Sequence, residues 1–417
     1  MANPRAENRE TPLATASRPR SAKKLFLGWL LATFGAILLI PSLLLAVGAF
    51  LPRLAYLGNL GTGLFATIPG QFVQLSMIGS LFAWSAVRLG VCRFGRLLIG
   101  LALCSFVSGI IILVIHTVIG FEAGVRVNPL EAFLFKPLSS AQPDITLTYT
   151  QDLGQNIKID LYLPAKSLNS APVMVYIHGG GWYTGNRAEQ AANLRWFADH
   201  GYLVMSPDYT LSTPQRSTWM IAGQQVACAF AWIEGHATEY GGDATRMFAD
   251  GGSAGGQLVL SYAFAANTNN NLAACDGKIA RVKAVAADVP AVDPISFYDN
   301  PDPLEGAWAR TMVSQYLGGT PIQYPDRAAY VSSKTYISAD APPALIILKN
   351  DDHLVPIQGA LEFVERSHQA GRSPRVLRIP LAEHWSSFNF HSVADQIVRQ
   401  MTVRFFCEHG GVCNSAQ

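Results

Sequence analysis

Three long runs without a charged residue lie near the N-terminus of this chain of 417 residues. They cover residues 25–51, 54–87 and 97–120. About 20 apolar residues in a helix cross the hydrocarbon core of a bilayer, and each run is at least that long. Buried core helices are usually shorter and carry a polar face, and the first run is too long for a cleaved signal peptide. The runs therefore predict a membrane region over 23–120 with three helices, at about 25–51, 64–87 and 97–120.

The basic residues around these runs predict the orientation of the chain. The N-terminal segment contains Arg5, Arg9, Arg18, Arg20, Lys23 and Lys24. The loop between the second and third runs contains Arg88, Arg93 and Arg96, whereas the loop between the first and second has only Arg53. Cytoplasmic loops are enriched in Lys and Arg. We therefore expect an integral membrane protein with a disordered cytoplasmic tail over 1–22 and an extracytoplasmic location for everything after Gly120.

The overall charge argues against a polyanionic partner. The formal net charge is +2, and charged residues make up 14% of the chain. No basic stripe with interleaved aromatic residues is present, so we expect no nucleic-acid partner. The sequence carries no signature of an oligomeric state.

Four of the six cysteines follow the membrane region, where an oxidising compartment would allow disulfides. Cys407 and Cys413 close a short loop, which leaves Cys228 and Cys275 as the second pair. Four free, buried thiols are the alternative, and the sequence does not choose between the two.

After a connector over 121–143, strand-like and helix-like segments alternate through an expected domain over 144–417. Two segments alternate polar and apolar residues, as antiparallel edge strands do, and the others are short apolar runs, as buried parallel strands are. The expected strands are 145–149, 157–163, 173–177, 202–206, 247–250, 282–287, 345–348 and 376–379. The main helical patterns are 191–200, 220–239, 257–266 and 356–370. This alternation predicts an α/β fold with an eight-stranded, mostly parallel sheet flanked by helices.

Two glycine-rich stretches, each at the end of an apolar run, contain the residues that indicate the type of reaction. Residues 178–182 read HGGGW, and residues 251–256 read GGSAGG, which fits G-x-S-x-G around Ser253. Glycines permit the cramped strand-to-helix turn on which such a serine is held. A glycine-rich turn with an incidental serine is the alternative for the second stretch alone, and neither stretch fits a phosphate-binding loop. The two stretches together, in this order, indicate a serine hydrolase with Ser253 as the nucleophile.

The first stretch predicts the donors that stabilise an oxyanion. Three consecutive glycines let the backbone turn its N–H groups toward the tip of the sheet, as in the HGGG loop of esterases and lipases. We assign Gly180 and Gly181 as two donors and the backbone N–H of Ala254 as the third. His178 precedes the nucleophile and is expected to shape the loop.

A serine hydroxyl needs a base to take its proton and an acid to orient that base. Where G-x-S-x-G marks the nucleophile, the acid and then the base follow it in the chain. Asp352 comes just after the apolar run 345–348 and is the expected acid, with Asp351 as the adjacent rival and Asp288 as a weaker one. Surface loops are rich in aspartate, so a solvated pair is the alternative.

Most of the nine histidines are excluded as the base by their position in the chain. His384 lies in a loop after the last expected strand and just before a helix, so it is the expected base. His391 is the runner-up. His353 adjoins Asp352 in sequence and can hardly be its partner.

Together these motifs resemble the α/β-hydrolase superfamily, and more narrowly its hormone-sensitive-lipase-like and related bacterial carboxylesterases. The resemblance covers about residues 144–405, with HGGGW, GGSAGG, the DHLVP string that begins at Asp352 and the EHW string around His384 in the family's order. It implies ester hydrolysis through an acyl-enzyme, with Ser253, Asp352 and His384 as the triad. The membrane region lies outside it.

Two departures from the family leave the substrate open. Lys349 stands three residues before the acid, where the family often has glycine. Tyr209-Thr210-Leu211 replaces the family's Tyr-Arg-Leu. We expect neither departure to touch the triad.

We therefore expect a membrane-anchored serine carboxylesterase that acts on a small-molecule or lipid ester and uses no metal or cofactor. A lipase on membrane lipids, an acyltransferase or amidase with the same triad, and a catalytically silent interaction module are the alternatives. A group of aromatic side chains after the sixth strand is expected either to cap the site or to pack on the surface: Phe297, Tyr298, Trp308, Tyr316 and Tyr324.

Overall fold

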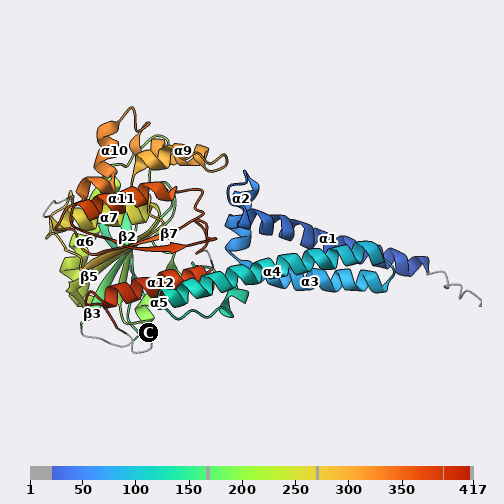
Figure 1. Cartoon of the computed structure of the whole chain (residues 1–417). Helices are drawn as coiled ribbons and strands as arrows, with labels where there is room; N and C mark the ends of the chain where they lie inside the picture. The colour runs from blue at the N-terminus through green and yellow to red at the C-terminus, as the bar shows by residue number, and fades with distance from the viewer. Residues whose placement is uncertain (1–20, 166–169, 269–271, 388, 414–417) are drawn as a thin grey trace, which may run out of the picture.

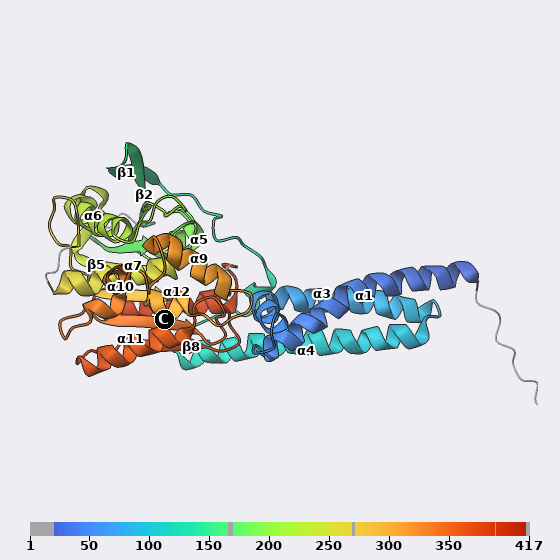
Figure 2. The same ribbon diagram turned by 90° about the horizontal axis from the view of Figure 1, so that it is seen from above.

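The computed structural model describes residues 21–165, 170–268, 272–387 and 389–413. The expected disordered tail, residues 1–22, falls almost wholly outside the described residues. A bundle of long helices projects from one side of a sheet-and-helix domain (Figures 1 and 2).

The bundle consists of the long helices α1 (Ala22–Phe50), α3 (Pro69–Arg88) and α4 (Cys92–Glu122). By length and composition α1 and α4 can each cross a membrane. The helix α3 meets this test only together with the preceding α2 (Leu57–Leu60) and the π-helical turn η1 (Gly61–Ala66), and that pair is bent by 91°. The part of the chain that the structure describes thus has two candidate membrane spans, or up to three if the bent pair counts as one.

The second span differs from the prediction at its start. A helix beginning near residue 64 was expected, but the straight helix begins at Pro69, and Ile68 has a non-helical backbone with φ −127° and ψ 55°. The ring of a proline disfavours the helical conformation of the residue before it and is well tolerated at the first position of a new helix. Pro69 therefore ends one helical segment and starts the next.

The domain is built on an eight-stranded sheet in the order β1-β2-β4-β3-β5-β6-β7-β8. The first two strands pair antiparallel with each other, β2 pairs antiparallel with β4, and the remaining pairs are parallel. Each lies where the sequence predicts it: β1 Ile145–Asp152, β2 Gln155–Tyr162, β3 Ala171–Ile177, β4 Leu203–Pro207, β5 Gly242–Gly252, β6 Ala284–Asp288, β7 Ala344–Lys349 and β8 Arg375–Ile379. The predicted α/β fold with a mostly parallel sheet is confirmed.

Helices cover both faces of the sheet, with α6, α7 and α11 on one face and α5 and α12 on the other (Figure 1). The strand β3 shows the consequence, because Val173, Val175 and Ile177 pack into one core and Met174 and Tyr176 into the other. This double burial explains why the central strands read as continuous apolar runs. The helices are α5 Ala191–Asp199, α6 Ile221–His236, α7 Ala254–Asn267, α8 Pro294–Tyr298, α9 Gly306–Leu317, α10 Pro325–Val331, α11 Ile357–Gln369 and α12 Val393–Cys407.

The helix α4 continues past the bundle and packs along α12, so the bundle and the domain are joined by more than the connector (Figure 1). Leu113 belongs to the same apolar core as Ile397, and the Arg404 guanidinium donates a 2.6 Å hydrogen bond to the carbonyl of Ala123. His116, inside the third predicted span, hydrogen-bonds to the carbonyl of Pro380 at 2.9 Å. These contacts hold the helices in a fixed position relative to the sheet.

The cysteine pairing that the sequence left open is present as two disulfides. Cys228 is bonded to Cys275, and Cys407 to Cys413.

Candidate active site

Ser253 lies on the turn between β5 and α7, at the carboxyl end of the parallel strands. Its backbone has φ 56° and ψ −120°, a conformation that residues with a side chain rarely adopt and that costs on the order of 1–3 kcal/mol. The turn is held by hydrogen bonds, since the Ser253 N–H donates to the carbonyl of Asp288 and the Ser253 carbonyl accepts from Gln257 and Ala291. The strained turn presents Ser253 at the tip of the sheet.

The glycines around Ser253 are required by close backbone contacts. A Cβ on Gly255 would lie 2.0 Å from the carbonyl oxygen of Ile177, the last residue of β3. A Cβ on Gly251 would lie 2.7 Å from the carbonyl oxygen of Gly255. Only glycine therefore lets the turn pack this closely against β3.

The HGGGW stretch follows β3 and runs beside this turn. A Cβ on Gly179 would lie 3.4 Å from Ser253 Cβ, so the two motifs are in contact. Gly180 and Gly181 have φ +96° and +57°. The Trp182 indole donates to Gln257 of α7 at 2.9 Å, and His178 stacks on Tyr209 with ring centroids 4.4 Å apart. These contacts of His178 agree with its expected role in shaping the loop.

The backbone N–H groups of Gly180 and Gly181 find no acceptor among the residues that the structure describes. Ala254 is the first residue of α7, and the first N–H groups of a helix have no partner within it. The helix end also favours negative charge. The three proposed donors thus lie close to Ser253 with N–H groups available for an oxyanion.

Asp352 and His384 form a buried pair. The carboxylate oxygen Oδ2 of Asp352 lies 2.7 Å from His384 Nδ1, and both side chains are almost fully buried. The other oxygen, Oδ1, accepts hydrogen bonds from the backbone N–H groups of Leu354 and Val355 at 3.0 and 2.7 Å. This geometry fixes the carboxylate and holds the imidazole with Nε2 on its far side from Asp352.

The rival residues have other partners. Asp288 pairs with Lys349, and His391 pairs with Glu131. Asp351 contacts neither His384 nor His391 directly, and burial raises the pKa of its carboxyl group. Of the acids and bases considered, the structure brings Asp352 and His384 together.

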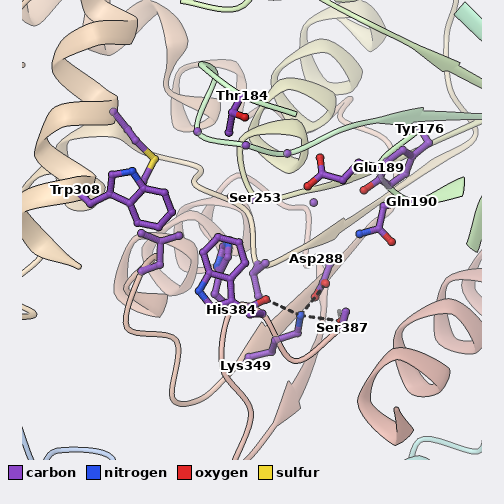
Figure 3. Close-up of a pocket in the computed structure, with 18 residues that line it drawn as sticks. Tyr176, Thr184, Glu189, Gln190, Ser253, Asp288, Trp308, Lys349, His384 and Ser387 are labelled. Atoms are coloured by element: carbon purple, nitrogen blue, oxygen red, sulfur yellow. Dashed lines mark hydrogen bonds and ion pairs between the residues drawn. The ribbon is translucent and has the colours of Figure 1, made fainter. Parts of the chain in front are cut away.

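Ser253 and His384 line the same cavity, with a volume of about 140 Å³ (Figure 3). Gly179, Gly180 and Gly181 line it as well. No hydrogen bond joins the Ser253 hydroxyl to the His384 ring, although both belong to the described residues. Such hydrogen bonds are often loose without substrate and tighten in the reacting complex.

Lys349 contradicts the expectation that it would not touch the triad. Its ammonium group is fully buried and donates to Asp288 at 3.0 Å, to Ser387 at 3.0 Å and to the carbonyl of His384 at 3.2 Å (Figure 3). It therefore holds the backbone of the proposed base. A lysine at the end of the apolar strand 344–349 was the signal in the sequence, because lysine is almost never fully buried unless paired.

A second histidine–carboxylate pair lies beside Asp352 and His384. His353 Nδ1 is 2.6 Å from Glu383 Oε2, and His353 Nε2 is 2.9 Å from the carbonyl of Pro52, between α1 and α2. The Thr62 hydroxyl of η1 donates to Glu383 at 3.2 Å. The helical bundle thus contacts the two loops that carry the proposed acid and base.

The aromatic side chains suggested for the site divide between two roles. Trp308 lines the cavity, and its indole donates to the Tyr183 hydroxyl at 2.9 Å. Tyr316 is buried and stacks on Trp182 with centroids 4.4 Å apart, and Phe297 is buried beside the same ring. Within the described residues, only Trp308 of the five suggested aromatics lines this cavity.

Known proteins that are similar to this chain include esterases. The BD-FAE family model matches residues 159–366. A probable carboxylic ester hydrolase, LipM of Mycobacterium tuberculosis, is 33% identical over 218 residues, which cover 52% of this chain and 49% of LipM. Esterase LipC of the same organism is 29% identical over 217 residues, 51% of this chain and 53% of LipC. The chain spans about half the length of these curated relatives.

Solved esterases share the fold. Apo esterase 2 of Thermogutta terrifontis has a TM-score of 0.53 and 25% identity, covering 65% of this chain and 96% of its own. Its propionate-bound form has a TM-score of 0.55 and 23% identity, covering 67% of this chain and 98% of its own.

Proposed function

Since this chain belongs to the α/β-hydrolase superfamily, we propose that it is a membrane-anchored serine carboxylesterase that works through an acyl-enzyme intermediate. The observation that carries the proposal is the buried Asp352–His384 pair, which opens onto the same cavity as Ser253 and the glycine loop. The names of the similar mycobacterial proteins, a carboxylic ester hydrolase and an esterase, support ester bonds as the substrate.

Each residue has a defined part in the proposed reaction. His384 Nε2 takes the proton of the Ser253 hydroxyl as its oxygen attacks the ester carbonyl, and Asp352 stabilises the resulting imidazolium. The N–H groups of Gly180, Gly181 and Ala254 stabilise the oxyanion, at about 3 kcal/mol for each donor. His384 then gives its proton to the leaving alcohol, and water attacks the acyl-enzyme with the same base to release the acid and restore Ser253.

A fluorophosphonate probe tests the nucleophile directly. We expect covalent labelling of the wild-type protein, none of Ser253→Ala, and hydrolysis of p-nitrophenyl butyrate by the wild type only. A folded wild-type protein that is neither labelled nor active would favour a silent interaction module. Product analysis with added alcohols separates hydrolysis from acyl transfer, because a transferase would yield the new ester.

We also propose that the bundle spans the membrane and that the domain lies on the extracytoplasmic side. The start of α1 and the turn between α3 and α4 lie at the end of the bundle remote from the sheet (Figure 2). That end carries Lys23, Lys24, Arg88, Arg93 and Arg96, which favours the cytoplasm. The two disulfides of the domain are suited to an oxidising compartment.

Fusions to the C-terminus of the full chain test this orientation in a bacterial host. We expect an alkaline phosphatase fusion to be active and a green fluorescent protein fusion to be dark. The opposite pair of results would place the domain in the cytoplasm.

A further inference from the structure

A second cavity, of about 660 Å³, lies between the helical bundle and the domain. Leu64 and Ile68, from the bent segment before α3, line it on the side of the bundle. Phe135 and Leu138 of the connector line it as well. The volume is in the usual range for ligand sites, which are concave and mostly apolar. We call this cavity the junction groove.

The junction groove adjoins the cavity of the candidate active site. Thr184, Glu189 and Gln190 line both cavities, and Figure 3 shows these side chains on the active-site side. The Glu189 carboxylate has a buried oxygen, Oε2, without a partner among the described residues. Burial raises the pKa of the Glu189 carboxyl group. Because the two cavities share these three residues, a substrate can extend from Ser253 into the groove.

The position of the groove is set by the length of α3. This helix has 20 residues, and at 1.5 Å per residue it is about as long as the hydrocarbon core of a bilayer is thick. Leu64 and Ile68 come just before its first residue, Pro69, so they lie at the membrane surface in the proposed arrangement, in which α3 crosses the bilayer. On the connector, Leu130, Leu134 and Phe135 have 74%, 56% and 62% of their surface exposed, as expected for side chains that meet lipid.

The walls of the groove are held together by direct contacts. The side-chain amides of Gln71 and Gln74 on α3 donate to the carbonyls of Leu134 and Phe133 at 3.0 and 3.1 Å. A Cβ on Gly70 would lie 2.2 Å from the carbonyl oxygen of Ala132, so the connector touches the α3 backbone. The groove is thus a preformed feature of the junction.

We propose that the junction groove binds the hydrocarbon chain of an ester lipid that enters from the membrane, while its ester group reaches Ser253. This inference rests on the proposed esterase function and adds a substrate class to it. The bundle then forms part of the substrate site. The apolar walls lie at the membrane surface and lead to the nucleophile, an arrangement that a water-soluble short ester does not need.

Gly63 offers a clean test, because it lines the groove and a Cβ added there would meet only Glu383 Cγ, at 3.9 Å. Gly63→Leu and Gly63→Trp place a larger side chain at this wall of the groove. Gly100 on α4 is the matched control, since a Cβ there meets nothing within 4 Å and the residue lines neither cavity. Phe135→Ala removes a groove wall, and Leu130→Ala is its control on the same connector.

The full-length variants are assayed in phosphatidylcholine vesicles with p-nitrophenyl laurate and p-nitrophenyl butyrate. We expect the ratio of kcat/KM for laurate to that for butyrate to fall at least tenfold in Gly63→Trp, and less in Gly63→Leu and Phe135→Ala. Gly100→Trp and Leu130→Ala should keep the wild-type ratio. An unchanged ratio in the groove variants overturns the groove proposal, while fluorophosphonate labelling of Ser253 in each variant tests the esterase proposal separately.

Discussion

His353 and Glu383 form an ion pair with an N–O distance of 2.6 Å, directly beside the Asp352–His384 pair. The two loops therefore run past each other with two consecutive residues on each side in contact. We call His353 and Glu383 the outer pair. On the side of the helical bundle, the Thr62 hydroxyl hydrogen-bonds to Glu383 and the carbonyl of Pro52 hydrogen-bonds to His353. The outer pair fixes the spacing of the two loops that the proposed reaction depends on.

The outer pair predicts a loss of stability at alkaline pH. Burial alone would lower the pKa of His353, but the hydrogen bond and charge of Glu383, with the Pro52 carbonyl and the charge of Asp302, raise it to about 9. A raised pKa means that the stabilisation is complete below about pH 6.5 and is lost as the pH rises through about 9. We expect the Tm in detergent to fall over this range in the wild type and to change less in His353→Gln.

His391→Gln is the matched control for this measurement, because His391 also contacts a glutamate, Glu131, but at 3.2 Å and away from the triad loops. Its Tm should follow the wild-type pH dependence. If His353→Gln did so too, the ion pair would have no role in the pH response.

Asp352→Asn should lower kcat by about 10⁴-fold with little change in KM, because an amide no longer stabilises the imidazolium or fixes its tautomer. Asp351→Asn is the neighbouring control and should retain most of the wild-type kcat. Steady-state kinetics with p-nitrophenyl butyrate measures both. Equal losses in the two variants would contradict the assignment of Asp352 as the acid.

Lys349→Met should destabilise the domain by about 3 kcal/mol, since it leaves the Asp288 carboxylate in a largely buried site without its cation. The second substitution Asp288→Asn should recover part of this loss, because it removes the uncompensated charge. Denaturant unfolding of the single and double variants in detergent gives the coupling between the two residues. Simple additivity would show that the pair is not coupled.

Gly255→Ala should abolish or strongly reduce folding, because the added Cβ would lie 2.0 Å from the Ile177 carbonyl oxygen at the tip of the sheet. Gly223→Ala on α6 has no neighbour within 4 Å of its Cβ and should stabilise the helix by about 1 kcal/mol. Expression level and Tm compare the two substitutions. A normal Tm for Gly255→Ala would mean that the turn can relax away from β3.

Local patterns in the sequence were sufficient for the strands, the long helices and the order of the motifs. Burial on both faces makes β3 and β7 continuous apolar runs, and the backbone strain at Ser253 requires nearby glycines. Each of these structural features therefore has a recognisable local sequence pattern. The start of α3 was missed because apolar composition continues through residues 64–68, while the backbone breaks at the Ile68–Pro69 step. Apolar composition indicates how long a membrane segment is, whereas the bend before α3 depends on backbone geometry.

Hydrophobic periodicity and glycine placement are properties of neighbouring residues, so they were sufficient to predict an α/β sheet with a glycine-rich serine turn after a set of apolar helices. Three contacts became visible only in the folded chain: Asp352 rather than Asp351 meets His384, Lys349 binds the carbonyl of His384, and Thr62 of the bundle side reaches Glu383. These contacts join residues that are 32, 35 and 321 positions apart. Their geometry is set by how the elements pack, which no local pattern encodes.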